Sequence, residues 1–76
     1  MNTVMIRLSS IQDVRNFVDT VTKYNIDIDL SSGRYIVDAK SIMGIFSLDL
    51  SKPIKVDVHS ENADAFVAEL KPYVQD

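Results

Sequence analysis

Three short stretches in which apolar and polar residues alternate constrain the fold of this chain most strongly. Their apolar residues stand two apart, which is the period of a strand with one buried face; they are Val4, Ile6 and Leu8, then Ile26, Ile28 and Leu30, then Ile54, Val56 and Val58. Such a face needs a second layer to cover it. The opposite face should be open to solvent; it carries Arg7, Asp27, Asp29, Lys55 and Asp57.

A turn follows the second of these stretches. In Ser31-Ser32-Gly33-Arg34, Gly33 can take a positive φ without steric cost. Tyr35 to Val37 then returns as a strand and makes a hairpin with the stretch that ends at Leu30. Pro53 precedes the last strand, where a proline is tolerated.

Three segments with helical spacing lie between and after the strands. The first runs from about Ile11 to Tyr24, with Ser10 as N-cap and Asp13 at the capping-box position; its apolar face is Ile11, Val14, Phe17, Val18 and Val21. The second is a short helix from Ser41 to Ser47, with Ser41 as cap. The third follows Ser60 as cap and ends or kinks at Lys71, before Pro72; its apolar face is Ala63, Phe66, Val67 and Leu70.

The resulting element order is β-α-β-β-α-β-α. A chain of 76 residues is long enough for one domain, residues 1–76, and too short for two. Hydrophobic residues make up 46% and charged residues 25%, which is typical of a globular protein. We therefore predict an α+β fold: a two-layer open-faced sandwich with a four-stranded antiparallel sheet and three helices on one face.

Composition argues against several classes of function. There are no cysteines and one histidine, so we expect no disulfide, no metal site and no cofactor. Lys and Arg are scattered and the net charge is −3, which does not favour direct nucleic-acid binding. No apolar stretch approaches the roughly 20 residues that span a bilayer, and the start lacks the pattern of a signal peptide. We expect a cytoplasmic protein that binds no membrane.

One segment is more specific. Lys40-Ser41-Ile42-Met43-Gly44, continued by Ser47-Leu48, resembles the regulatory-serine segment of the HPr family, the phosphocarrier proteins of the bacterial sugar phosphotransferase system. Thr20-Val21-Thr22-Lys23-Tyr24 resembles the end of that family's first helix. The family has the element order predicted above, with its strands arranged 1-4-2-3. The resemblance therefore implies an HPr-like fold, although the part after Lys52 matches in pattern more than in residues.

The family's first helix is preceded by Gly-x-His-Ala-Arg-Pro, whose histidine carries the phosphoryl group. Counting back without gaps from Lys23 places Ser10 at this histidine, Gln12 at the arginine and Asp13 at the proline. A serine ester would transfer its phosphoryl group far less readily than a phosphoramidate, and the Asp13 carboxylate would repel an incoming phosphate. We therefore expect neither a catalytic residue nor phosphocarrier activity, and the chain is predicted not to be an enzyme.

His59 is the remaining candidate for a phosphoryl acceptor. If the first and last strands are antiparallel neighbours, six residues at about 3.3 Å each place His59 roughly 20 Å from Ser10. We interpret His59 as a solvated residue at a strand end.

Ser41 has a structural role and an implied regulatory role. As cap of the short helix, its hydroxyl can accept a hydrogen bond from the backbone N–H of Met43 or Gly44. The resemblance implies phosphorylation of Ser41 by the HPr kinase of Gram-positive bacteria. A phosphate there would lie at a helix N-terminus, which favours an anion, so it would change what the surface binds more than the fold.

A short helix cannot bury apolar residues on every side, so part of this segment should be exposed. We predict a partner-binding surface beside Ser41; it comprises Lys40, Ile42, Met43, Phe46 and Leu48. The resemblance implies that such a surface docks regulatory proteins, including the catabolite-control repressor of low-GC Gram-positive bacteria. Phe46 stands where the family more often has methionine. Alternatively the patch packs on the sheet, and an exposed Phe46 would equally support a homodimer.

Three hypotheses for function follow. The leading one is an HPr-like binding module without a histidine phosphocarrier site that acts through Ser41 and its apolar neighbours. It is similar in this respect to the catabolite-repression homologue of HPr. The second is a phosphotransferase-system phosphocarrier that uses a non-standard site. The third is an interaction or structural domain that does not signal.

Overall fold

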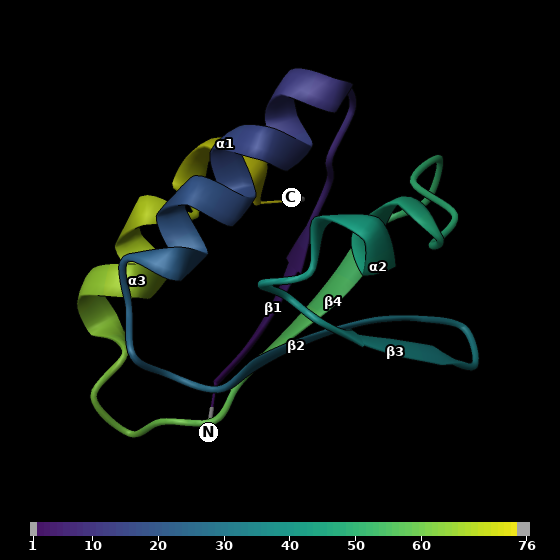
Figure 1. Cartoon of the computed structure of the whole chain (residues 1–76). Coiled ribbons are helices and arrows are strands. Elements are labelled where there is room, and N and C mark those ends of the chain that lie inside the picture. Colours follow the sequence, from purple (N-terminus) through teal and green to yellow (C-terminus); the bar gives the residue numbers. More distant parts are fainter. Residues whose placement is uncertain (1, 75–76) are drawn as a thin grey trace.

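The computed structural model describes residues 2–74 and confirms the predicted order of elements (Figure 1). The strands are β1 (Asn2–Ile6), β2 (Ile28–Ser32), β3 (Tyr35–Asp38) and β4 (Ile54–Val58). The helices are α1 (Ile11–Thr22), α2 (Ile42–Phe46) and α3 (Asp64–Glu69), and a turn of 3₁₀ helix (Lys71–Tyr73) follows α3.

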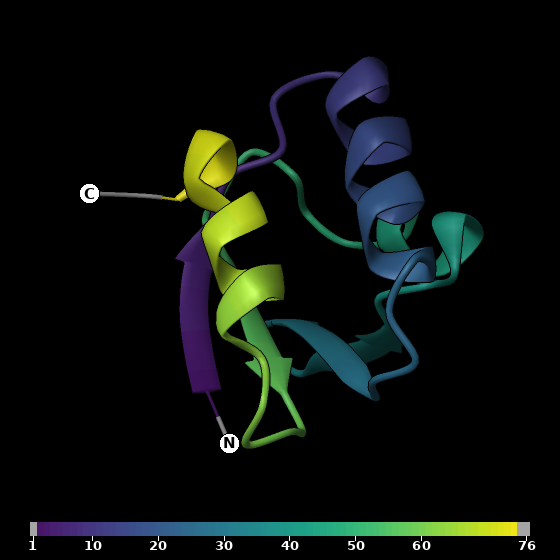
Figure 2. The same ribbon diagram turned by 90° about the vertical axis from the view of Figure 1, so that its left-hand side faces the viewer.

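The four strands form one antiparallel sheet in the order β1-β4-β2-β3, as the resemblance implies. The register pairs Val4 with Val56 and Leu30 with Val56, so the buried positions of neighbouring strands stand side by side. Figures 1 and 2 show the three helices on one side of this sheet. The α+β open-faced sandwich is thus confirmed.

The core lies between the sheet and the helices, where the alternating strand residues meet the apolar helix faces. Its largest fully buried side chains include Phe17 of α1, Phe66 of α3 and Ile45 of α2. Within the described residues, no polar or charged side chain is buried. On the other face of the sheet, Arg7, Asp27 and Lys55 are exposed and Asp29 and Asp57 are half-buried. The predicted division of the sheet into two faces holds.

The hairpin between β2 and β3 uses a two-residue turn. Gly33 has φ +59°, and no other residue has a positive φ in the part of the chain that the structure describes. A positive φ at the first turn residue, Gly33, and a negative φ at the second, Arg34, are typical of a type II′ turn. The twist of this turn matches that of the strands it joins.

Several boundaries differ from the sequence prediction. The first strand ends at Ile6 instead of Leu8, and the second begins at Ile28 instead of Ile26. Ser60 does not cap the last helix: its hydroxyl accepts a hydrogen bond from the Asn62 amide at 3.1 Å, which closes a turn ahead of the helix. The helix therefore begins at Asp64, with no side-chain cap.

Candidate functional site

The N-terminus of α1 carries Ser10, Gln12 and Asp13, the three residues that we predicted to stand at the family's transfer site. Ser10 is exposed, and its Oγ accepts a hydrogen bond from the Asp13 amide at 3.1 Å, as predicted for a cap. The Asp13 carboxylate accepts a hydrogen bond from the Ser9 amide at 3.0 Å, one residue before the partner that a capping box uses. The Gln12 side chain donates to the Asn16 side chain at 2.9 Å.

The carboxylate of Asp13 sets the charge at this end of α1. Burial and, secondly, the negative charge of Asp13 raise the pKa of the Tyr73 hydroxyl. A helix N-terminus ordinarily attracts an anion through its free amides. Here the Asp13 carboxylate lies in the first turn and accepts from the Ser9 amide, and its negative charge disfavours a second anion nearby.

The one histidine of the chain lies at the other end of β1. Asn2 pairs with Val58 in the register, which places His59 beside the start of β1, whereas Ser10 follows its end. The His59 Nε2 lies 2.9 Å from an Asp29 carboxylate oxygen. His59 is thus engaged on the open face of the sheet and does not join Ser10 in a common site.

Ser41 lies between β3 and α2 and is fixed from both sides. Its Oγ accepts a hydrogen bond from the Gly44 amide at 3.1 Å, one of the two donors that the sequence predicted. Its own amide donates to the Asp38 carbonyl at 3.0 Å, and the Lys40 amide donates to the Asp38 carboxylate at 2.9 Å. The hydroxyl is held at the start of α2 on an exposed residue.

Gly44 allows this arrangement. A Cβ atom at Gly44 would lie 3.1 Å from the Ser41 Oγ and 3.2 Å from the Val37 Cβ. Both contacts are tighter than ordinary van der Waals contact. Gly44 therefore allows the close approach of α2 to its own cap and to β3, and a Cβ atom there would require Ser41 or Val37 to shift by a few tenths of an ångström.

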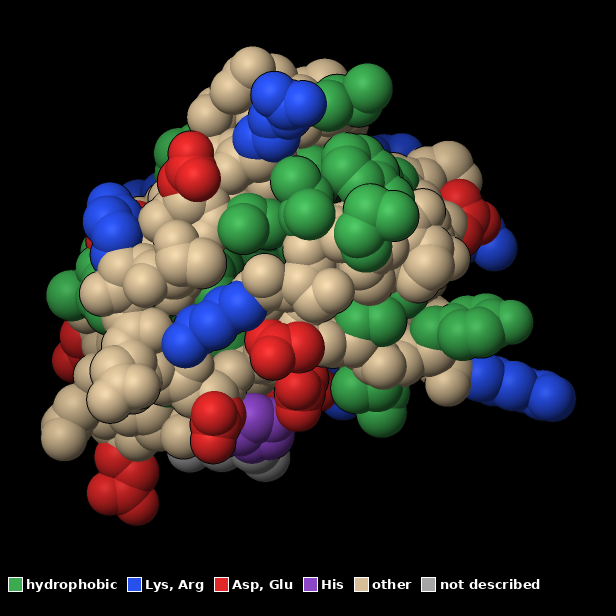
Figure 3. All heavy atoms as spheres, in the orientation of Figure 1, with side chains coloured by type: hydrophobic (Ala, Val, Ile, Leu, Met, Phe, Trp, Pro, Cys, Tyr) green, Lys and Arg blue, Asp and Glu red, His purple; other side chains and the backbone are tan. Residues whose placement is uncertain are grey.

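The predicted partner-binding residues differ in how far they are exposed. Met43 is 77% exposed and Phe46 is 41% exposed, while Ile42 and Lys40 are half-buried. We call these four residues the α2 surface. In Figure 3, hydrophobic side chains gather over α2 and continue toward β3.

Leu48 does not belong to the α2 surface. It is 6% exposed and is part of the core, because the chain turns inward after α2 ends at Phe46. Ile45 is fully buried. The alternative that the whole segment packs on the sheet thus holds for Ile45 and Leu48, while Met43 and Phe46 remain exposed.

Sequence reasoning missed Ile11, which was placed on the apolar face of α1 but is 63% exposed. It lines a shallow hollow between the start of α1 and the end of α2; the other lining residues are Leu8, Ser9, Ser10, Phe46, Leu50 and Ser51. The sequence signal for its exposure is the position of Ile11 as the first residue of the helix, before the first complete turn. The start of α1 and the α2 surface therefore form one continuous area.

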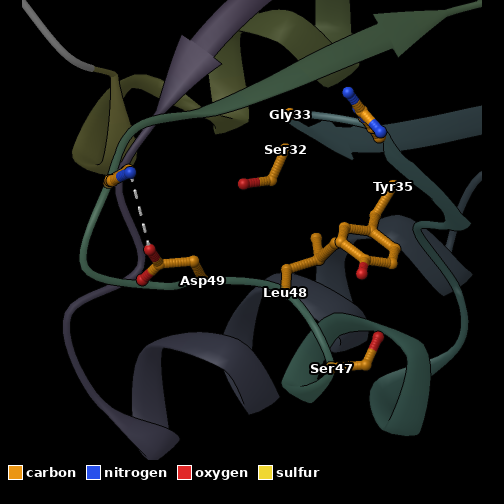
Figure 4. Close-up of a pocket in the computed structure, with 8 residues that line it drawn as sticks. Ser32, Gly33, Tyr35, Ser47, Leu48 and Asp49 are labelled. Atoms are coloured by element: carbon orange, nitrogen blue, oxygen red, sulfur yellow. Dashed lines mark ion pairs between the residues drawn. The ribbon is translucent and has the colours of Figure 1, made fainter.

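A second hollow lies between the β2–β3 turn and the segment after α2 (Figure 4). In this view the Leu48 side chain points toward the Tyr35 ring. Asp49 and Lys52 form an ion pair there at 3.9 Å, and hydrogen bonds from Ser51 lower the pKa of the Asp49 carboxyl. Neither Ser10 nor Ser41 lines this hollow. It is separate from the hollow that Ser10 and Phe46 line.

Residues 2–74 contain neither a metal site nor a membrane-spanning helix. No group of three or more acidic or histidine side chains could hold a metal ion there. None of the helices in that range has the length and apolarity needed to cross a membrane.

Comparison with known proteins identifies the family. Residues 13–76 match a family model described as the PTS HPr component phosphorylation site. The matched range starts at Asp13, so Ser10 and Gln12 lie before it.

Solved structures of the same family have the same fold. HPr-C-His from Thermoanaerobacter tengcongensis aligns with a TM-score of 0.78 and 27% identity, over 92% of this chain and 86% of that one. HPr from Bacillus anthracis aligns with a TM-score of 0.72 and 27% identity, over 97% and 94%. The catabolite-repression protein Crh of Bacillus subtilis, described as a domain-swapped intertwined dimer, shares the fold at 21% identity and a TM-score of 0.65, over 93% and 88%. This chain belongs to the HPr family of the phosphotransferase system.

Proposed function

We propose that this protein is a cytoplasmic regulatory binding module of the HPr family that does not carry phosphate on histidine. It acts through Ser41 and the adjacent α2 surface and is not an enzyme. The observation that carries this proposal is the difference between its two capping serines. The serine at the family's histidine position stands beside a carboxylate, and the serine at the regulatory position stands beside exposed apolar side chains.

The chemistry at Ser10 does not favour phosphoryl transfer. Ser10 provides a hydroxyl and no imidazole nitrogen, so a phosphate there would be a stable ester. Its neighbour Asp13 lies in the first turn of the helix. Two unit charges at about 4 Å repel by roughly 4 kcal/mol at an effective dielectric constant of about 20, which disfavours a phosphate beside this carboxylate.

The surroundings of Ser41 favour a phosphate. No acidic residue lies in the first turn of α2, and Ser41 is exposed. The amides at a helix start can donate to a phosphate, and Lys40 adds a positive charge next to the modified residue. The phosphate would break the hydroxyl cap on Gly44 and replace it with stronger acceptor oxygens, so little refolding is needed.

A phosphate on Ser41 would change recognition by the α2 surface. Met43 follows Ser41 by two residues and is largely exposed. A partner that contacts both the phosphate and this flexible apolar side chain would bind the modified chain selectively. By resemblance to the family, we propose HPr kinase as the modifying enzyme and a catabolite-control-type transcription regulator as the partner.

Incubation with HPr kinase and ATP, followed by intact-mass measurement, tests the proposal. We expect the mass of one phosphate on the natural chain and on Ser10→Ala, and none on Ser41→Ala. Ser10→Ala is the matched control, because it also removes a capping hydroxyl from an exposed serine. The absence of any mass gain, or a gain that persists in Ser41→Ala, would remove the proposal.

A further inference from the structure

The two edges of the sheet differ in how they are covered. Along β1, the Arg7 amide donates to the Tyr73 carbonyl at 2.8 Å, and Ile6 forms a bridge with Val74, so the C-terminal segment covers part of that edge. β3 is the other edge strand and pairs only with β2. Figures 1 and 2 show β3 at the margin of the sheet.

β3 is protected as an edge strand by its short length and by Asp38 at its end, while its first two side chains are apolar and exposed. Natural edges carry charged residues, prolines or bulges that prevent pairing with another chain. In β3, Tyr35 is 68% exposed and Ile36 is 71% exposed. They are the first two residues of a strand whose outer backbone groups have no strand partner among residues 2–74.

The register determines which backbone groups of β3 point outward. In a two-residue hairpin the residues that flank the turn, Ser32 and Tyr35, exchange hydrogen bonds, and such pairs then alternate along the ladder. Leu30 and Val37 form the next hydrogen-bonded pair, so Tyr35 and Val37 bond to β2. The N–H and C=O groups of Ile36 therefore point away from β2.

We propose that β3 pairs antiparallel with β3 of a second copy of this chain, about a two-fold axis at Ile36. In this register the Ile36 residues of the two copies lie opposite one another and exchange two backbone hydrogen bonds. Tyr35 lies opposite Val37 of the second copy, and Arg34 lies opposite Asp38. The two sheets then join into one sheet of twice the width.

Each pair in this register is complementary in side-chain type. Val37 lies opposite the buried Leu30, which places Val37 and Tyr35 on the helix-covered face and Ile36 on the open face. Residues directly opposite in an antiparallel pair point to the same face, so Tyr35 would cover the half-buried Val37 of the second copy. Ile36 would contact Ile36.

Charge supports the same register. Asp38 lies opposite Asp29 of β2, which juxtaposes two carboxylates. Like charges directly opposite in a sheet are destabilising. The guanidinium of Arg34 from the second copy would lie beside Asp38 and offset this repulsion. The short strand limits the contact area, so we expect a weak dimer that depends on concentration.

Sedimentation velocity over a range of concentrations tests this dimer. Ile36→Lys places two positive charges opposite one another and should raise the dimer dissociation constant by about tenfold or more. Met5→Lys is the matched control, because Met5 is 42% exposed and lies on β1 at the opposite edge of the sheet. We expect it to leave association unchanged. Arg34→Glu would place a carboxylate opposite Asp38 of the second copy, so it should also weaken the dimer.

Hydrogen exchange of the natural chain provides a second measurement. Protection of the Ile36 amide should rise with protein concentration, because this amide has no acceptor in β2. A chain that stays monomeric at the highest concentration would overturn the proposal. So would a dimer that Ile36→Lys leaves intact, or one that Met5→Lys disrupts equally. The inference is independent of the proposed function, which concerns Ser41.

Discussion

Two serines of this chain cap helices with the same geometry, and their surroundings differ in charge. Ser10 accepts a hydrogen bond from the amide three residues later at 3.1 Å, and so does Ser41. The first turn of α1 contains Asp13, whereas the first turn of α2 contains no acidic residue. The carboxylate near Ser10 therefore lies within the first turn of its helix, whereas the carboxylate near Ser41, that of Asp38, precedes the helix and accepts a hydrogen bond from the Lys40 amide.

A capping hydroxyl alone therefore does not indicate a phosphate site. The neighbouring charge decides whether a phosphate can be accommodated, and the neighbouring exposed side chains decide what the phosphate can influence. We propose that both conditions are met at Ser41.

The largest effect should come from rebuilding the transfer site at α1. Incubation with enzyme I and phosphoenolpyruvate should give no acid-labile phosphate on the natural chain, because we propose that Ser10 stands at the position of the family histidine. The triple variant Ser10→His, Gln12→Arg, Asp13→Pro should gain such phosphate, and Ser10→His alone should gain much less, because Asp13 remains. Acid-labile phosphate on the natural chain would contradict the account.

The next effect should come from Gly44→Ala. The added methyl group meets Ser41 Oγ and Val37 Cβ at 3.1 and 3.2 Å, so it should lower the free energy of unfolding by about 1–3 kcal/mol. Urea denaturation measures this change, and phosphorylation of Ser41 should become slower. Arg15→Ala, an exposed change in α1, should stay within about 0.5 kcal/mol. Equal stability of Gly44→Ala and the natural chain would show that α2 is not held by this contact.

Removing either capping hydroxyl should have a smaller and similar effect on stability. Ser10→Ala and Ser41→Ala should each lower the free energy of unfolding by about 1 kcal/mol, measured by urea denaturation. Their effects on phosphorylation should differ completely, which separates the structural role that both share from the regulatory role of Ser41. If Ser10→Ala also prevented modification by the kinase, the two helix starts would not be distinct.

The smallest effect on stability should come from removing the charge of Glu69, whose carboxylate contacts the residues that follow α1. Glu69 pairs with Lys23 at 2.9 Å and accepts a hydrogen bond from the Tyr24 hydroxyl. The hydrogen bond from Tyr24 and then that from Lys23 lower the pKa of the Glu69 carboxyl. Because the folded-state pKa is below the unfolded one, the stabilisation is present above the unfolded pKa and is lost as pH falls through the folded pKa.

The stability difference between the natural chain and Glu69→Gln should therefore shrink on acidification from neutral pH. The difference should be small throughout, because both partners of this ion pair are largely exposed. Urea denaturation at several pH values measures it. A difference that grows as pH falls would reverse the sign and contradict the assigned pKa direction.

Sequence patterns predicted the fold well because each strand buries one face. Val4, Leu30 and Val56 fall on the covered side as their spacing requires, and the strand order follows the family. The predicted cap at Ser10 is also present. Spacing did not determine where the last helix starts, because Ser60 bonds to Asn62 in a turn that precedes it.

Exposure within the candidate site was harder to predict. Ile11 and Leu48 are both apolar residues next to a helix end, yet Ile11 is 63% exposed and Leu48 is 6% exposed. Their burial depends on whether the chain beyond the helix turns toward the sheet or away from it, which is a tertiary property. The α2 surface was therefore predicted with one residue too many, and the exposed Ile11 was missed.

The most direct test of the central claim is a calorimetric titration of a catabolite-control-type repressor with this chain before and after phosphorylation of Ser41. We expect the phosphorylated chain to bind the repressor more tightly than the unphosphorylated chain. Met43→Lys should abolish this gain in affinity, because we propose that the phosphate and the α2 surface are recognised together. Equal affinity of the phosphorylated and unphosphorylated chains would contradict the claim that Ser41 controls this surface.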